Sequence, residues 1–168
     1  MWYVIQVQSG REEKIKTECE KIISKQTLTK CFIPYIEKMR RYEGKQHIER
    51  RLMFPGYVIL ISDNLEQLFF ELKKVKELTK LIGTGREAVP LSVEEIELIQ
   101  NLTGDKGIVE MSKGVIEGEK MIVFSGPMQG CEGLIKKIDR HKRLAYLQIP
   151  FMGRIVETQV GLEIIRKG

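Results

Sequence analysis

The segment FSGPMQGCEGLIKKIDRHKR, residues 124–143, combines a glycine-rich turn with a dense run of cations. Its first half holds Gly126, Pro127, Gly130 and Gly133, residue types that form the tight turns between strands. Runs that alternate apolar and polar residues precede and follow it, with turns roughly every eight to twelve residues. This pattern predicts a small β-barrel in the C-terminal part of the chain.

The predicted barrel has five strands, one for each alternating run after residue 117. These runs are KMIVF (120–124), GLIKKI (133–138), RLAYLQI (143–149), RIVETQV (154–160) and LEIIRK (162–167). Alternation through GLIKKI predicts that Lys136 and Lys137 point to opposite faces of their strand. Residues 103–117 contain several glycines and no clear period, so we expect a linker or a linking strand there.

The residues before this linker predict an α/β domain with the element order β-α-β-β-β-α-β-α. Its strands are expected at 2–8, on both sides of Glu43-Gly44 within 31–54, at 54–62 and at 78–82. Its helices are expected at 9–24, from Asp63 or Asn64 to about 72, and at 92–102. Two of these helices begin with the spacing of a capping box, Ser9 with Glu12 and Ser92 with Glu95.

Positive charge is concentrated in the C-terminal part of the chain. Residues 118–168 hold 9 Lys and Arg against 5 Asp and Glu, whereas residues 1–117 hold 19 against 18. A protruding cationic hairpin tip on a small barrel suits RNA phosphates or a nucleic-acid groove, and a solvated surface that only prevents aggregation is the alternative. We favour nucleic acid, because within eight residues one acid, Asp139, stands among five cations: Lys136, Lys137, Arg140, Lys142 and Arg143.

Two further cation-rich segments lie before the linker. The strand pair within 31–54 is basic, and a strand edge protected by charge explains it better than nearby DNA or polymerase. The tetrapeptide KKVK, residues 73–76, falls at the end of a predicted helix. Cations there favour the helix dipole, and lysines can equally hold phosphates. Both interpretations of KKVK stay open.

The composition excludes several classes of protein. The 3 cysteines are not spaced as CxxC and the chain has 2 histidines, so we expect reduced thiols and no zinc site. The longest apolar runs, such as YVILI (57–61), are too short to span a membrane, and we see no signal peptide. The sequence has no GxxxxGK phosphate loop and no serine-nucleophile elbow. We therefore expect a cytoplasmic protein that is not an enzyme.

Three stretches together resemble the NusG family of transcription elongation factors: WYVIQVQSGREEKI (2–15), RRLMFPGYVIL (50–60) and GEKMIVFSGPMQGCEGLIKKID (118–139), the last similar to a KOW motif. The resemblance covers nearly the whole chain. It implies an α+β fold: a ferredoxin-like NGN domain at 1–102, a linker at 103–117 and an SH3-like five-strand KOW β-barrel at 118–168. It also implies a monomeric factor that needs no cofactor.

The resemblance further implies contacts with RNA polymerase. NGN domains bind the clamp helices of the polymerase through an apolar depression, and the FPGY motif places the aromatic ring of Phe54 in that contact, as an interface anchor. The implied polymerase-binding residues are Phe54, Gln6, Pro55 and Tyr57. The residues implied at the non-template DNA strand are Lys73, Lys74 and Lys76.

Two departures from the family pattern point to a specialised paralogue. The strand after the Gly-Pro turn tends to be acidic or mixed in the family, whereas here it is basic. The family often has an aromatic residue directly before Gly-Arg, whereas here Met152 precedes Gly153-Arg154 and Phe151 lies one place earlier. We therefore expect a LoaP-type factor that promotes antitermination on selected operons and binds leader RNA through its KOW domain. The expected RNA-binding residues are Lys136, Lys137, Arg140, His141, Lys142, Arg143 and Arg154.

Two other functions stay open. A general NusG elongation factor couples RNA polymerase to the ribosome or to Rho through its KOW domain. A ribosomal or assembly protein built on a KOW barrel binds RNA without binding RNA polymerase.

Overall fold

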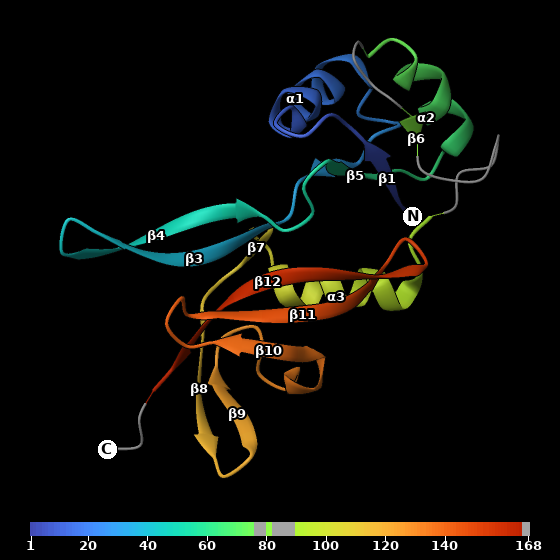
Figure 1. Cartoon of the computed structure of the whole chain (residues 1–168). Helices are drawn as coiled ribbons and strands as arrows, with labels where there is room; N and C mark the ends of the chain where they lie inside the picture. The colour runs from blue at the N-terminus through green and yellow to red at the C-terminus, as the bar shows by residue number, and fades with distance from the viewer. Residues whose placement is uncertain (76–79, 82–89, 166–168) are drawn as a thin grey trace. The chain divides into compact units, whose positions relative to one another are not determined.

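The computed structural model describes residues 1–75, 80–81 and 90–165, and its class is α+β, as expected. The chain forms two compact units, each built from two separate segments. Unit 1 comprises residues 1–33 and 54–96, and unit 2 comprises residues 34–53 and 97–168. Figure 1 shows the elements of both units. These units do not test the domain limits expected from the sequence, which remain a prediction.

Unit 1 holds a four-stranded antiparallel sheet with two helices, α1 (Glu12–Ile22) and α2 (Leu65–Leu72). The strand order is β2 (Lys30–Phe32), β5 (Tyr57–Ile61), β1 (Trp2–Gln6) and β6 (Lys80–Leu81). Strand β6 lies within the strand expected at 78–82, of which residues 78–79 and 82 lie outside the described residues. Residues 2–5 of β1 and 58–60 of β5 are buried, because both central strands carry the core of this unit.

Two helices begin as the sequence predicts. At α2, Asn64 Oδ1 accepts a hydrogen bond from the Gln67 amide at 3.1 Å. At α3 (Val93–Thr103), Ser92 Oγ accepts from the Glu95 amide at 3.1 Å, and Glu95 Oε1 accepts from the Ser92 amide at 2.8 Å. This reciprocal pair confirms the predicted capping box.

The capping box predicted for α1 is wrong. Arg11, rather than Ser9, holds the N-cap position. The Glu12 carboxylate accepts instead from the amides of Gly10 at 2.7 Å and Gly56 at 2.8 Å. Because Gly56 lies 44 residues further along the chain, one of these two contacts is tertiary, and neither is to Ser9.

Unit 2 contains a long hairpin of β3 (Tyr35–Tyr42) and β4 (Lys45–Leu52), cyan in Figure 1. Its turn falls at Glu43 and Gly44, as expected, with φ angles of 52° and 72°. This left-handed pair is what a two-residue type I′ turn requires. The short strand β7 (Ile108–Val109) runs parallel to β3 and completes a sheet of order β4-β3-β7.

The five-stranded sheet of unit 2 has the order β10-β11-β12-β8-β9. The strands are β8 (Ser112–Glu117), β9 (Lys120–Ser125), β10 (Ile135–Asp139), β11 (Leu144–Phe151) and β12 (Arg154–Ile164), with a 3-10 turn, η1 (Glu132–Leu134), before β10. Large apolar side chains such as Leu147 and Ile149 of β11 are fully buried. None of the helices in the described part of the chain is long and apolar enough to cross a membrane.

The five strands differ from the five predicted runs. RIVETQV and LEI belong to the single strand β12, and the fifth strand is β8, from within the predicted linker. Gly161 lies inside β12 instead of ending a strand, and a Cβ there would lie 2.6 Å from the Glu37 carbonyl oxygen. This glycine therefore allows β3 to approach β12 closely.

The glycine-rich turn after β9 packs against the start of β8. Gly126 has a φ of 98°, and a Cβ there would lie 2.6 Å from the Ser112 Cα. Ser112 Oγ, which is buried, accepts from the Met128 amide at 3.0 Å. Hydrogen bonds from its own amide and from that of Val123 lower the pKa of Glu132 in η1. The turn therefore fixes where β10 begins.

Candidate nucleic-acid interface

The loop between β10 and β11 forms the predicted cationic tip. Asp139 pairs with Leu144, so residues 140–143 make up the loop. Asp139 Oδ1 accepts from the Lys142 backbone amide at 2.9 Å, and Arg143 has a φ of 56°. Three of the loop's side chains are exposed and that of Arg143 is half-buried. The cations therefore project from a short, hydrogen-bonded tip.

The two lysines of β10 lie at a β-bulge. Ile135 is opposite Leu147 and Lys137 is opposite Tyr146, so Lys136 is the additional residue. The bulge interrupts the alternation from which opposite faces were predicted, and both lysines are exposed. Lys137 Nζ lies 5.6 Å from the centroid of the Tyr146 ring, within cation–π distance.

Arg154 lies at the other end of β11. It is exposed and pairs with Phe151 across a two-residue turn, in which Met152 and Gly153 have φ angles of 59° and 74°. At about 3.4 Å per residue, the two ends of β11 are roughly 24 Å apart. The structure therefore does not bring Arg154 to the loop at 140–143. The Phe151 ring is fully buried in unit 2.

The β3–β4 hairpin gathers cations on one face. Because side chains alternate along a strand, Lys38, Arg40 and Arg51 share a face with Glu49. Glu49 accepts from Arg40 at 3.2 Å and lies 3.8 Å from Arg51. Solvated ion pairs of this kind fit the predicted charge-protected edge, but they engage only part of the positive charge.

A charge of the β10–β11 loop acts on a lysine of this hairpin face. Burial, and then the positive charges of Arg51, Lys142 and Arg40, lower the pKa of Lys38, and Glu49 opposes this effect. Sequence reasoning missed this convergence, because Lys38 and Lys142 are roughly 100 residues apart along the chain. The charge counts of the two segments were the only available signal.

A second contact joins the hairpin to the loop. With the Gln46 amide oriented so that its oxygen accepts, that oxygen lies 2.8 Å from one terminal nitrogen of Arg143 and 3.3 Å from the other. This contact explains why Arg143 is the least exposed cation of the loop.

The lysines expected at DNA follow α2. Lys73 is the C-cap residue, Lys74 comes next, and both are exposed. Lys74 Nζ lies 5.1 Å from the centroid of the Phe70 ring. Lys76 lies outside the described residues. The two described lysines therefore sit at a solvated helix end, where both predicted interpretations still apply.

The residues expected to bind polymerase gather at one end of unit 1. The Tyr57 amide donates to the Phe54 carbonyl at 3.3 Å, and Gly56 between them has a φ of 88°, as in a type II turn with Pro55 at its second position. Gln6 lies directly opposite Tyr57 in the sheet. Gln6 and Pro55 are exposed and Tyr57 is half-buried, whereas Phe54 is 3% exposed. In this structure the Phe54 ring belongs to the core.

Glu12 positions this turn, and sequence reasoning missed that role. Glu12 is 2% exposed and its carboxylate accepts from the Gly56 amide, so it fixes the turn from the first residue of α1. An acid near a helix start normally indicates a cap, and nothing local distinguishes the tertiary contact.

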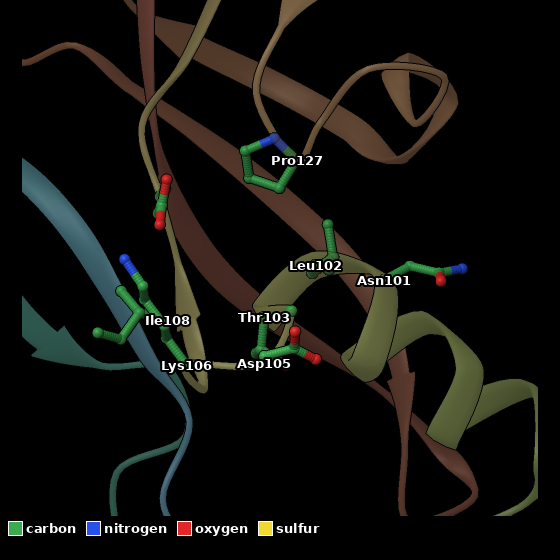
Figure 2. A pocket seen from close by; sticks show the side chains of 9 residues that line it. Asn101, Leu102, Thr103, Asp105, Lys106, Ile108 and Pro127 are labelled. Atoms are coloured by element: carbon green, nitrogen blue, oxygen red, sulfur yellow. The ribbon is translucent and has the colours of Figure 1, made fainter.

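A pocket of about 270 Å³ lies in unit 2 beside the end of α3. Figure 2 shows Pro127 facing the helix end near Leu102, with Asp105 and Lys106 on the following loop. Charges of both signs line the pocket, from Asp105, Lys106 and Glu110. Across residues 1–75, 80–81 and 90–165, no group of three or more His, Cys, Asp or Glu side chains could hold a metal ion.

Similarity to known proteins extends along the whole chain. Residues 1–100 match the NusG family described as "Transcription termination factor nusG". The chain is 27% identical to the transcription termination/antitermination protein NusG of Borreliella burgdorferi, over 99% of this chain and 97% of that protein. It is 29% identical to the protein of that name from Thermus thermophilus, over 96% of this chain and 94% of that protein.

A solved structure is also similar. It is described as "Domain interaction in Thermotoga maritima NusG", and it matches 96% of this chain and 92% of its own with a TM-score of 0.63 and 27% identity. The chain therefore belongs to the NusG family. It is a transcription termination/antitermination factor and not an enzyme.

Proposed function

We propose that this NusG factor binds RNA polymerase and promotes processive antitermination on selected operons, as a LoaP-type paralogue. The β10–β11 loop then binds a leader RNA that marks those operons. One observation carries this proposal: the loop projects Arg140, His141 and Lys142 into solvent, and the carboxylate of its neighbour Asp139 already accepts the Lys142 amide. Such a tip offers cations to phosphates at little conformational cost.

The remaining predicted RNA-binding residues are proposed to contribute unequally to RNA affinity. Lys136 and Lys137 adjoin the loop at the bulge of β10 and extend the same cationic surface. Arg143 adds its positive charge to this surface while its guanidinium contacts Gln46. Arg154, roughly 24 Å away along β11, reaches a different part of the RNA and contributes least.

Single-round transcription tests this function. Templates carrying different leaders upstream of one terminator are transcribed with and without the full chain. We expect readthrough to increase on a template with the cognate leader, and the double variant Arg140→Gln, Lys142→Gln to abolish that increase while still binding polymerase. Lys120→Gln, an exposed lysine on β9, is the matched control. An equal increase on every template would contradict operon selection.

A general elongation factor is the second candidate. Its support is that the relatives matched along their whole length are proteins named NusG. In that function unit 2 binds the ribosome or Rho in place of RNA. Because the Phe151 ring is fully buried, the contact surface must use other residues. Retention of Rho or ribosomes by the immobilised chain, with no preference among RNA leaders, would favour this candidate.

We infer that polymerase clamp helices bind the surface of Gln6, Pro55 and Tyr57. Phe54→Ala is a poor test, because truncating a buried Phe costs about 3–5 kcal/mol of folding free energy. Tyr57→Ala is the sharper variant, and we expect roughly tenfold weaker polymerase binding. Glu66→Ala on α2 is the control. Unchanged polymerase binding in the Tyr57 variant would contradict the assignment of this surface. If the wild type does not bind polymerase at all, the alternative of a ribosomal or assembly protein would be favoured.

Lys73, Lys74 and Lys76 are proposed to hold phosphates of the non-template DNA strand. The support is the exposure of the first two at the end of α2. We expect Lys73→Gln with Lys74→Gln to reduce cross-linking to that strand in elongation complexes and to leave RNA binding unchanged. Unchanged cross-linking would mean that these lysines are solvated side chains at a helix end and do not bind DNA.

A further inference from the structure

Two elements far apart in the sequence place cations side by side in unit 2. Burial, and then the positive charges of Arg51, of Lys142 in the β10–β11 loop and of Arg40, lower the pKa of Lys38 on β3. Holding like charges together opposes folding unless an anion binds between them. The close approach at Gly161 and the contact of Gln46 with Arg143 keep the two elements in this position.

The acids nearby are already engaged. Among the described side chains of β3 and β4 on this face, Glu49 is the only acid; it forms ion pairs with Arg40 and Arg51, so its attraction for Lys38, directly opposite it, is shared among three cations. Glu37, on the other face of β3, accepts from the Met111 amide at 3.0 Å. Asp139 accepts from the Lys142 amide. Lys38 and the Lys142 side chain therefore retain charge for an external anion.

An aromatic platform stands on the same hairpin face. Tyr42 is 44% exposed and stacks on His47, with ring centroids 3.8 Å apart and planes 12° apart. The Arg40 guanidinium carbon lies 5.7 Å from the Tyr42 centroid. A flat ring beside cations is the arrangement that binds an unstacked base and its phosphates.

We propose that the β3–β4 hairpin and the β10–β11 loop form one composite surface for single-stranded RNA, in which Lys38 and Lys142 hold phosphates and Tyr42 stacks on a base. This inference rests on the proposed function, because it adds the hairpin to the loop assigned there. A duplex hides its bases from such a ring, so the surface selects an unpaired strand or the loop of an RNA hairpin. The hairpin, expected from the sequence to be a protected edge, becomes half of the RNA site.

The test measures affinity of the full chain for oligo(U), for an RNA stem–loop with a uridine loop, for the same stem as a duplex, and for oligo(dT), each at several salt concentrations. The variants are Lys38→Gln, Lys142→Gln, Tyr42→Leu and Tyr42→Phe, with Lys120→Gln as the control. Lys38→Gln is not expected to impair folding, because it removes a partly buried cation that its positive neighbours repel, and a thermal melt checks this.

We expect Lys38→Gln and Lys142→Gln each to weaken binding to oligo(U) and to reduce the log–log salt slope by about 0.7. Tyr42→Leu should weaken binding roughly tenfold without changing the slope, because stacking releases no counterions. Tyr42→Phe keeps the ring and should bind like the wild type. Both oligo(U) and the stem–loop should bind more tightly than the duplex.

Each other outcome overturns a defined part of the account. If Lys142→Gln weakens binding and the Lys38 and Tyr42 variants do not, the composite surface is wrong and the loop alone binds RNA. If neither the hairpin nor the loop variants change affinity, the proposed RNA binding fails as well. Equal affinity for oligo(dT) would overturn the choice of RNA, and tighter duplex binding would overturn the stacking platform.

Discussion

Two lysine-rich places in this protein differ in how their charge is arranged. At the end of α2, Lys73 and Lys74 are neighbours in sequence, and Lys74 lies beside Phe70. Hydrogen bonds from Thr27 and Ser24, and then the charge of Lys74, lower the pKa of Glu71. At the β10–β11 loop, the cations adjoin others that come from a distant hairpin, and burial together with these positive charges lowers the pKa of Lys38. Similar sequence patterns therefore place cations beside an acid in unit 1 and beside other cations in unit 2.

The comparison shows that density of charge along the chain is a weak guide to a binding site. A cation beside an acid is already partly neutralised and gains little from a phosphate. Cations held together by the fold gain more, because an anion relieves their repulsion. The places where a tertiary structure gathers like charges are the better candidates for nucleic-acid binding.

Separating the β3–β4 hairpin from strand β12 should have the largest effect on stability and RNA affinity. A side chain at Gly161 meets the Glu37 carbonyl, so Gly161→Val must push β3 away from β12. We expect a loss of about 3 kcal/mol in the free energy of unfolding, measured by denaturant titration, with a clear loss of RNA affinity. Gly133→Ala is the control, because its Cβ meets nothing within 4 Å. A fully stable Gly161 variant would contradict the close approach.

Reversing charge at the two places should separate their roles. We expect Arg140→Glu with Lys142→Glu to weaken RNA binding on the order of 100-fold at low salt, since each lost phosphate contact is replaced by repulsion. Lys73→Glu with Lys74→Glu should change RNA affinity little. Fluorescence anisotropy with oligo(U) measures both. Equal losses in the two double variants would mean that net charge alone governs binding.

The pH dependence of Glu71 gives a smaller effect. Hydrogen bonds from Thr27 and Ser24, and then the charge of Lys74, lower its pKa below the ordinary 4.5. Because the folded value is the lower one, this contribution to stability is complete above pH 4.5 and is lost as pH falls through the folded pKa. Thermal melts across this range should show Glu71→Gln losing less stability than the wild type on acidification. An equal acid loss in the variant would contradict the assignment, and Glu66→Gln is the control.

The smallest effect concerns the charge of Lys74 alone. We expect Lys74→Gln to raise the pKa of Glu71 slightly, because a favourable positive charge is removed while the hydrogen bonds remain. A carboxyl-carbon NMR titration measures this. A pKa that does not move would show that Lys74 is fully screened by solvent, and its charge would then be available to DNA.

The sequence predicts this fold well wherever the determinant is local. Ser92 with Glu95 forms its capping box because both partners lie within one helical turn. Glu43-Gly44 forms its turn because left-handed residues suit a two-residue hairpin. The family resemblance rests on the same kind of local pattern, and its match over residues 1–100 agrees with it.

The sequence fails where a distant residue decides. Glu12 leaves its expected cap for Gly56, and Gly161 continues a strand because β3 needs room beside it. Phe54 is buried even though its motif predicts a contact residue. The meeting of Lys38 with Lys142 follows from the packing of β3 on β12, which no periodicity or motif records.

A double-mutant cycle tests most directly whether the β3–β4 hairpin and the β10–β11 loop bind one RNA together. The salt slope of oligo(U) binding is measured for the full-length wild type, Lys38→Gln, Lys142→Gln and the double variant. We predict that the double variant loses about 1.4 from the slope, the sum of two phosphate contacts on a single strand. A double variant with the same slope as Lys142→Gln would contradict the claim, because Lys38 would then face no phosphate.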